Sequence, residues 1–362
     1  MATVTRNTKN VPYYLLGGGA FSHLEALVNA RRQGASGTAL FYVDHFFENR
    51  ELTKKLPVAA GDHVFFVNTE KEPTVEGIDM FADLAKARLG GGQPCCIVGI
   101  GGGAVLDTTK AVGNLLTNPG KAADYQGWEL VKNPAPYKIA VPTLAGTGAE
   151  VSRTCVLLNA ARKLKLGMNS DHTVFDQIVL DPELTHSVPR DQFFYTGVDT
   201  YMHCFESIRG RYRNIIVDNL SATAIAMCCE IFLSDDMQSP ENQEKMMVTS
   251  YLGGMAAGNT GLVHPFSAGL SVELHIPHGL ANCLALSVLG EFYPEEYAQF
   301  NEMLARQKVT LPSRVCADLP DDRLEGLYMG SIIHEKPLAN ALGDDFKSIL
   351  TREKVISLFK QL

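Results

Sequence analysis

The stretch that decides the fold is "CCIVGIGGGAVLDTTK", residues 95–110. Its first six residues are mostly apolar and typical of a buried strand, and three consecutive glycines follow them. Residues from 104 onward have the apolar periodicity of a helix. A strand, a glycine turn and a helix in this order are typical of one unit of a parallel sheet. We therefore expect an α/β fold around this segment.

Further strand-like runs lie on both sides of this segment. They are short and apolar, and helical patterns separate them: "TALFYVD" (38–44), "HVFFVN" (63–68) and "YKIAVPT" (137–143). Helical patterns cover 77–89 and 104–116. This alternation predicts a parallel, doubly wound sheet with helices on both faces.

The second half of the chain has a different pattern. From about residue 187 strand signals nearly vanish, and helical periodicity covers 217–234, 242–258 and 344–362. We predict an α/β dinucleotide-binding domain at residues 1–186 and an all-helical, metal-binding domain at residues 187–362. An active site is expected in the cleft between the two domains.

Composition limits the classes of function. The net charge is -8 and no long Lys/Arg run occurs, which disfavours a nucleic-acid surface. No uncharged apolar run reaches 18 residues and the first residues do not read as a signal peptide, so we expect no membrane association. The eight cysteines include no C-x-x-C spacing. Free thiols in a reducing compartment, the cytoplasm, are the expectation.

"TGVDTYMHCFES", residues 196–207, contains two polar residues in a segment that otherwise reads as a packed helix. Asp199 and His203 are four positions apart, so their side chains leave the same face of a helix. This pattern has three readings. The pair is a hydrogen-bonded Asp–His couple, two polar residues on a wetted face, or half of a metal site.

A second segment concentrates histidines. "GLVHPFSAGLSVELHIPHGLANCLALS", residues 261–287, contains His264, His275 and His278. Pro277 should end any helix that begins near residue 265, so the chain can turn back and bring His264 and His278 together. Together the two segments offer four nitrogen and oxygen donors and no thiolate, a set that suits zinc, iron or another first-row divalent ion: Asp199, His203, His264 and His278.

Two glycine-rich turns indicate a nucleotide site. Gly101 opens a helix whose free N–H groups and dipole can bind phosphate. A second turn, "VPTLAGTGAEVS" (141–152), offers the hydroxyls of Thr143 and Thr147. The acidic residue expected about 20 positions after a dinucleotide fingerprint is missing, whereas Asp44 ends an earlier strand. Turns that need small residues only for close packing would have the same composition.

These segments, in this order and spacing, resemble the iron-containing, group III metal-dependent alcohol dehydrogenases, whose fold is shared with dehydroquinate synthase. The resemblance runs to about residue 290 through "GGGAVLDTTK", "PTLAGTGAEVS" and both histidine segments. It implies an NAD-dependent enzyme that forms a homodimer and that holds a metal through the four donors above. It also places nucleotide contacts on these residues: Asp44, Gly101, Gly102, Gly103, Asp107, Thr143, Thr147 and Lys165.

The chain departs from the family pattern in two places. Many members carry a proton-relaying histidine four residues after the third ligand, where this chain has Ala268. We expect His275 to act as the relay instead. The helix of the first two ligands is followed by "SIRGRYRNIIVD". Its three arginines are either a solvated basic loop or a binding site for an anionic substrate: Arg209, Arg211 and Arg213.

Within the family, the whole pattern is most similar to enzymes that oxidise the C8 primary alcohol of 3-deoxy-D-manno-octulosonate, a lipopolysaccharide sugar acid. This similarity implies an acidic sugar as substrate and functional coupling to an aminotransferase that consumes the aldehyde. Three alternatives stay open: a metal- and NAD-dependent cyclase of the dehydroquinate-synthase type, a dehydrogenase for a neutral alcohol or polyol, and a nucleotide-binding regulator. Because segment 261–287 contains no Lys or Arg, it disfavours the phosphate-binding cyclase.

Overall fold

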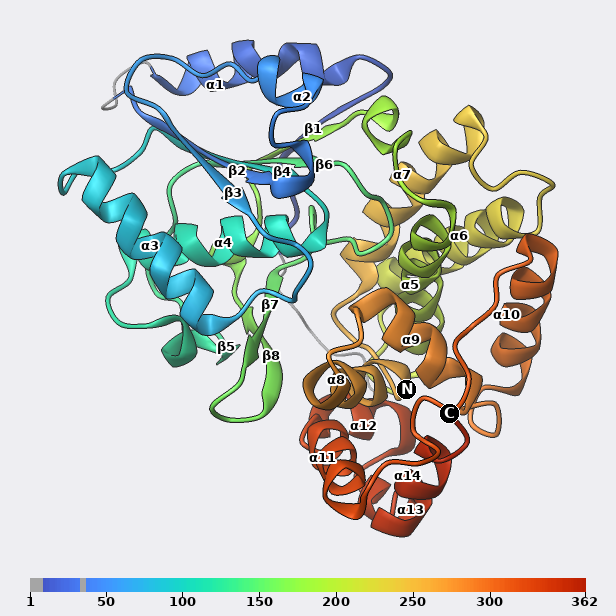
Figure 1. Ribbon diagram of the computed structural model, residues 1–362. Coiled ribbons are helices and arrows are strands. Elements are labelled where there is room, and N and C mark those ends of the chain that lie inside the picture. Colours follow the sequence, from blue (N-terminus) through green and yellow to red (C-terminus); the bar gives the residue numbers. More distant parts are fainter. Residues whose placement is uncertain (1–8, 33–36) are drawn as a thin grey trace.

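The computed structural model describes residues 9–32 and 37–362 of the chain. Its first half contains both sheets, and its second half consists of helices (Figure 1). The last strand ends at Leu180 and the first long helix of the second half begins at Arg190, so residue 186, where we place the boundary, lies between them. The predicted α/β half and the helical half are both present.

A six-stranded sheet forms the centre of the first half, and every pairing in it is parallel. The strand order is β1-β9-β6-β4-β2-β3. In chain order its strands are β1 (Tyr13–Leu16), β2 (Ala39–Asp44), β3 (His63–Val67), β4 (Cys96–Gly101), β6 (Lys138–Pro142) and β9 (Gln177–Leu180). The four predicted strands are β2, β3, β4 and β6, and each lies within one residue of its predicted limits.

The helices of this half connect and cover the parallel strands, as a doubly wound sheet requires (Figure 1). They are α1 (Leu24–Arg32), α2 (Glu51–Lys54), α3 (Val75–Leu89) and α4 (Gly103–Thr117). Separate apolar clusters form on the two faces of the sheet, because side chains of β2 alternate between them. Leu40 and Tyr42 belong to one cluster, and Phe41 and Val43 belong to the other.

A second, smaller sheet was not predicted. It contains β5 (Gly127–Trp128), β7 (Thr154–Asn159) and β8 (Leu164–Asn169), and β7 and β8 form an antiparallel hairpin. Residues along β7 alternate between half-buried and buried, the pattern of a sheet covered on one side. This hairpin matters for the site because β8 carries Lys165.

The second half is an array of helices: α5 (Arg190–Arg209), α6 (Ile215–Phe232), α7 (Pro240–Ala256), α8 (Val263–Leu274), α9 (His278–Ser287), α10 (Pro294–Gln307), α11 (Asp321–Ile332), α12 (Glu335–Leu342), α13 (Phe346–Ile349) and α14 (Arg352–Phe359). The helical periodicity over 344–362 corresponds to two short helices, α13 and α14. The chain breaks after α13, and the Thr351 side chain starts α14 by accepting a hydrogen bond from the Lys354 N–H group. Local capping therefore overrode the apolar periodicity.

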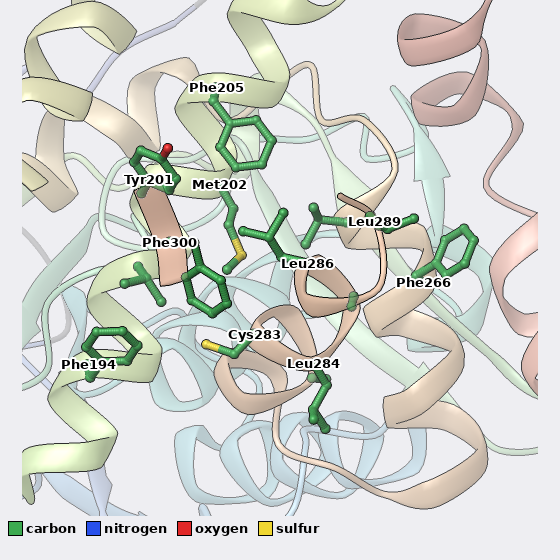
Figure 2. Close-up of a cluster of buried hydrophobic side chains, with 14 of the residues drawn as sticks. Phe194, Tyr201, Met202, Phe205, Phe266, Cys283, Leu284, Leu286, Leu289 and Phe300 are labelled. Carbon is green, nitrogen blue, oxygen red and sulfur yellow. The ribbon is translucent and has the colours of Figure 1, made fainter. Parts of the chain in front are cut away.

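The core of the helical half is built around α5 and α9. Figure 2 shows aromatic and aliphatic side chains of these helices meeting Phe300 of α10. On α5 the side chains of Tyr201, Met202 and Phe205 are buried in this cluster. The remaining face of the same helix is therefore held at a fixed position within the protein.

Among the described residues, α6 is long and apolar enough to cross a membrane by length and composition alone, with a mean hydropathy of 1.6. It contains Asp218 and Glu230 and lies against α5 and α7 within the helical array. The same length and composition occur in core helices of globular proteins.

Candidate metal centre and cofactor edge

Helix α5 carries the first two predicted metal ligands. Asp199 and His203 are both buried, at 1% and 7% exposure, in the middle of the helix. His203 Nε2 lies 3.6 Å from Asp199 Oδ1, as expected for side chains one turn apart. The predicted helix and its shared polar face are confirmed.

Helices α8 and α9 carry the other two predicted ligands. His264 lies in the first turn of α8, and His278 is the first residue of α9. Between them the chain reverses at His275, which has a left-handed φ of 58°, and at Pro277, the N-cap of α9. The imidazole centroids of His264 and His278 are consequently 5.9 Å apart. Pro277 separates the two helices as predicted.

Donor atoms of Asp199, His264 and His278 all lie within 4.8 Å of one another. The fourth predicted ligand, His203, stacks on His264 with 4.4 Å between the ring centroids. Asp199 Oδ2 is buried and has no hydrogen-bond partner among the described residues. A buried carboxylate oxygen without a donor is costly unless a cation balances it. The residues therefore fit a divalent metal ion.

The electrostatic surroundings of Asp199, His203 and His278 favour the protonation states that bind a cation. Burial raises the pKa of Asp199, but the neighbouring histidines outweigh it and hold the pKa well below its usual range, so the carboxylate is ionised. Burial lowers the pKa of His203 to about 4, and burial together with the Lys165 ammonium lowers that of His278 to about 3. Both imidazoles are neutral near pH 7 and keep a lone pair for a metal.

Glu206 is a residue of the candidate site that our sequence analysis missed. It lies one turn after His203 on α5 and is 1% exposed. Its Oε1 accepts a hydrogen bond from the Val263 N–H group at 2.6 Å, and its Oε2 lies 2.5 Å from His264 Nδ1. Burial lowers the pKa of His264, but Glu206 and Asp199 outweigh it and raise the pKa to about 9. The D-x-x-x-H-x-x-E spacing, which puts three polar residues on one helix face, was the available signal.

Asn282 is a second missed residue. It lies one turn after His278 on α9 and is fully buried. Its amide Nδ2 donates a hydrogen bond to Asp199 Oδ1 at 2.7 Å and lies 3.3 Å from His278 Nε2. Asn282 therefore holds the carboxylate in place from the opposite helix, which is the usual role of a residue outside the ligand set.

The predicted cofactor residues of the first half meet at the carboxyl edge of the parallel sheet. Gly101 pairs with Pro142 in the register of β4 and β6, and the Thr143 N–H group donates to the Gly101 carbonyl. A side chain at Gly101 would meet Val105 at 2.5 Å and Asp44 at 3.2 Å. Asp44, at the end of β2, is therefore adjacent to the glycine turn.

The two glycine turns are also adjacent to each other. A side chain added at Gly103 would meet Thr147 at 3.1 Å, and one added at Gly102 would meet Leu144 at 3.4 Å. Gly102 is the N-cap of α4 and offers no side chain, so the first N–H groups of the helix have open access. This edge is the usual position of a dinucleotide in a doubly wound sheet.

Two other predicted nucleotide residues have protein partners. Asp107 Oδ2 accepts a hydrogen bond from the Val156 N–H group at 2.9 Å, and burial raises the pKa of Asp107 to about 6. Lys165 is 5% exposed and lies 3.0 Å from Glu72 Oε1. Glu72 in turn accepts a hydrogen bond from the backbone N–H group of His278. The α/β half and the helical half therefore meet at this point.

The predicted relay, His275, is exposed at the end of α8. Ala268, where related chains carry a histidine, is 6% exposed. A different histidine, His334 at the start of α12, has a buried Nε2 atom without a hydrogen-bond partner among the described residues. Burial, and next the Lys165 ammonium, lower the pKa of His334 to about 4. The relay role of His275 stays a prediction.

The three arginines predicted to bind an anionic substrate have carboxylate partners on the protein. Arg209 pairs with Glu295 and Glu296, at 2.7 Å to the latter. Arg213 pairs with Asp218 at 3.0 Å, and Arg211 lies 3.7 Å from Asp344. These contacts fix the loop between α5 and α6 and explain the arginines without a substrate. Their role in substrate binding stays a prediction.

Comparison with known proteins agrees with this geometry. The sequence profile described as iron-containing alcohol dehydrogenase matches residues 12–182, and that of the Fe-containing alcohol dehydrogenase family, C-terminal, matches residues 193–318. Sulfoacetaldehyde reductase of Bilophila wadsworthia is 35% identical over 267 residues, which cover 70% of this chain and 67% of the reductase. Probable alcohol dehydrogenase EutG of Escherichia coli is 30% identical over 68% of this chain and 62% of its own length, under two thirds of that relative.

Solved structures share the fold over nearly the whole chain. Sulfoacetaldehyde reductase from Bifidobacterium kashiwanohense, in complex with NAD+, superposes with a TM-score of 0.80 at 21% identity over 98% of each chain. An iron-containing alcohol dehydrogenase from Thermotoga maritima superposes with a TM-score of 0.78 at 23% identity over 98% of this chain and 99% of its own. The profile matches to both halves and the relative at 35% identity show that the chain belongs to the iron-containing alcohol dehydrogenase family.

Proposed function

We propose that the protein interconverts a primary alcohol and its aldehyde by metal-dependent hydride transfer to and from NAD. The observation that carries this proposal is the set of buried Asp199 and half-buried His264 and His278, whose donor atoms lie within 4.8 Å of one another, with His203 beside them. A carboxylate with several imidazoles is a ligand set for a Lewis-acidic ion such as zinc or iron. A divalent ion held there would polarise the oxygen of the substrate.

Neighbouring residues of the chain orient these ligands for that ion. Glu206 Oε2 accepts a hydrogen bond from His264 Nδ1–H, so a metal ion would bind His264 through Nε2, which lies 3.3 Å from Asp199 Oδ1, in place of the Nε2 proton. Asn282 fixes the orientation of the Asp199 carboxylate through Oδ1 and leaves Oδ2 free. Burial of these residues excludes water and strengthens each electrostatic contact.

NAD is the hydride carrier in this proposal, and the glycine turns after β4 and β6 would hold its phosphates. Asp44 would accept hydrogen bonds from the ribose hydroxyls. Its Oδ1 already accepts hydrogen bonds from the Phe46 N–H group and the Thr69 hydroxyl, which fixes the carboxylate at the end of β2. A fixed carboxylate would repel a 2′-phosphate, so NAD should be preferred to NADP.

The substrate is proposed to be an aldehyde or primary alcohol with an anionic group. Two candidates have support: the C8 hydroxyl of 3-deoxy-D-manno-octulosonate, from the sequence resemblance, and sulfoacetaldehyde, the substrate in the name of a relative at 35% identity. In the first case an aminotransferase would consume the aldehyde product. The metal ligands and the glycine turns are the same for either substrate.

A substrate screen that follows NADH absorbance tests this function. Purified protein is assayed with zinc or iron(II) added, using the eight-carbon sugar acid, sulfoacetaldehyde with NADH, and neutral short alcohols. Metal-dependent turnover with at least one substrate, and a higher kcat/KM for acidic substrates, is expected. Absence of any metal-dependent change in NADH absorbance contradicts the proposed dehydrogenase activity. Equal kcat/KM values for acidic and matched neutral substrates contradict only the proposal that the substrate is anionic.

A further inference from the structure

Glu72 lies in the α/β half, in the loop between β3 and α3, yet its side chain contacts the helical half. Its Oε1 accepts a hydrogen bond from the backbone N–H group of His278 at 3.1 Å. The same oxygen lies 3.0 Å from the Nζ atom of Lys165 on β8. One carboxylate oxygen therefore touches a predicted metal ligand and a predicted cofactor residue.

The contact with His278 supplies what helix α9 lacks. Its N-cap is Pro277, which makes no side-chain capping hydrogen bond, so the first N–H groups of the helix have no partner from their own cap. A carboxylate at this position satisfies an N–H group and interacts favourably with the helix dipole. Glu72 thus caps α9 from the other half of the chain, and α9 carries both His278 and Asn282.

The position of Glu72 is itself fixed. The carbonyl of the next residue, Pro73, accepts a hydrogen bond from the Leu158 N–H group of β7 at 2.8 Å. Thr74 then caps α3 by accepting a hydrogen bond from Gly77. The loop is held at Pro73 and Thr74, so the backbone that carries the Glu72 carboxylate is fixed to the α/β half.

The other partner, Lys165, retains donors for a ligand. Its ammonium is buried, and apart from the Glu72 ion pair it has no hydrogen-bond partner among the described residues. An anion or hydroxyl bound to Lys165 would compete for or reorient this ion pair.

We propose that Glu72 is a positioning residue that couples the cofactor site to the metal site, through Lys165 on one side and the start of α9 on the other. This inference rests on the proposed function, because it needs both NAD and a metal ion as ligands. Cofactor binding at Lys165 shifts the carboxylate, and the carboxylate places His278. The affinity for metal should therefore depend on NAD, and by thermodynamic reciprocity the affinity for NAD should depend on metal.

The test measures Zn2+ affinity by competition with a chelator, with and without saturating NAD+, and needs no turnover. In the wild-type protein NAD+ should change the zinc Kd by about 5-fold or more, the lower end of typical coupling. Glu72→Ala should weaken zinc binding about 10- to 100-fold, as loss of a residue that supports a ligand usually does. It should also abolish the effect of NAD+. Glu70→Ala is the matched control, because Glu70 is an exposed glutamate two residues earlier in the same loop.

Two further variants separate the helix cap from the ion pair and cover the case in which Glu72→Ala does not fold. Glu72→Gln keeps an oxygen for the His278 N–H group but loses the charge, and Lys165→Met removes the other partner. Both should retain zinc within about 10-fold of the wild-type affinity and lose the dependence on NAD+.

Three results overturn the inference. The first is a zinc Kd in Glu72→Ala equal to that in Glu70→Ala. The second is a wild-type zinc Kd that does not change when NAD+ is added. The third is an effect of NAD+ on the zinc Kd that persists in Glu72→Gln and Lys165→Met. A wild-type protein that binds neither zinc nor NAD+ contradicts the proposed function itself, and this inference with it.

Discussion

At the scale of single residues, the Glu206 carboxylate determines which nitrogen of His264 is free to bind a metal. Its two oxygens face two donors, the Val263 N–H group and the His264 Nδ1–H group. Only a carboxylate accepts from both at once. An amide of the same shape would put its NH2 group against one of the two, and a good contact with Val263 would force the His264 proton onto Nε2.

Glu206→Gln should therefore lose metal although it preserves the side-chain volume. We expect metal affinity to fall about 10- to 100-fold, with little change in the secondary structure seen by circular dichroism. Metal content after dialysis against a weak chelator measures the effect. Glu302→Gln is the matched control, because Glu302 is an exposed glutamate on α10. A Glu206→Gln protein that keeps as much metal as the control would contradict the role assigned to Glu206.

Asp44 provides a second prediction at this scale. The wild-type protein should have a higher kcat/KM with NAD than with NADP, because the carboxylate at the end of β2 repels a 2′-phosphate. Asp44→Ala should lower the efficiency with NAD and narrow the ratio between the two nucleotides. Steady-state kinetics with both nucleotides and one alcohol measures the ratio. Equal or better efficiency of the wild-type protein with NADP would contradict the assignment.

At the scale of elements, the second glycine turn joins the cofactor edge to the metal helix. Gly146 has a φ of 133°, and a side chain there would lie 2.0 Å from the Thr196 carbonyl oxygen of α5. The Gly146 carbonyl also accepts a hydrogen bond from the Thr200 hydroxyl at 2.6 Å. Thr200 follows Asp199 directly, so this turn fixes the metal helix against the sheet edge.

Gly146→Ala should separate these two elements. Left-handed backbone strain and overpacking against the α5 backbone together should cost about 2–6 kcal/mol of unfolding free energy. The midpoint of urea denaturation measures the loss. Gly18→Ala serves as the control, since only the flexible Glu183 side chain lies within 4 Å of the added carbon. Equal midpoints for the two variants would show that the turn does not support α5.

The elements that sequence alone predicted are those with strong periodicity or strong punctuation. Strands β2, β4 and β6 are buried and β3 is mostly half-buried, and all four are largely apolar runs with turn residues after them. Pro277 marks the junction of α8 and α9. The hairpin β7–β8 was missed because the apolar run of β7, Cys155–Leu158, is short and β8 has Lys165 and Gly167 between its apolar residues. The break between α13 and α14 was missed because it depends on one cap.

The candidate site was predictable where several residues of one chemistry lie close in sequence. Asp199 and His203 share a helix turn, and His264 and His278 flank a proline. Glu72 was out of reach of such reasoning, because it is 206 positions from His278 and meets it only when the two halves pack.

At the scale of the whole molecule, buried thiols should make the fold sensitive to alkaline pH. Burial raises the pKa of seven of the eight cysteines, to about 12 for Cys204 and about 11 for Cys316. The unfolded chain releases these protons near pH 9, whereas the folded chain keeps them. The stability due to the thiols is therefore full below about pH 9 and falls as pH rises through the folded values.

The free energy of unfolding should thus be lower at pH 10 than at pH 7.5, by up to about 1.4 kcal/mol per pH unit for each titrating thiol. Lys110 and Lys138 act in the opposite direction, because burial lowers the pKa of both, to about 8 for Lys138, but they are two groups against seven. Urea denaturation under reducing conditions at both pH values measures the change. Cys204→Ala should show a smaller loss, and equal stability at the two pH values would contradict the prediction.

The fold as a whole brings residues from both halves together around the candidate metal site. The central claim of our account is that this site binds a metal ion. Elemental analysis of the purified wild-type, His264→Ala and His275→Ala proteins tests it most directly. We predict about one zinc or iron ion per chain in the wild-type and His275→Ala proteins, and close to none in His264→Ala. A His275→Ala protein without metal beside a His264→Ala protein that retains it would contradict the account.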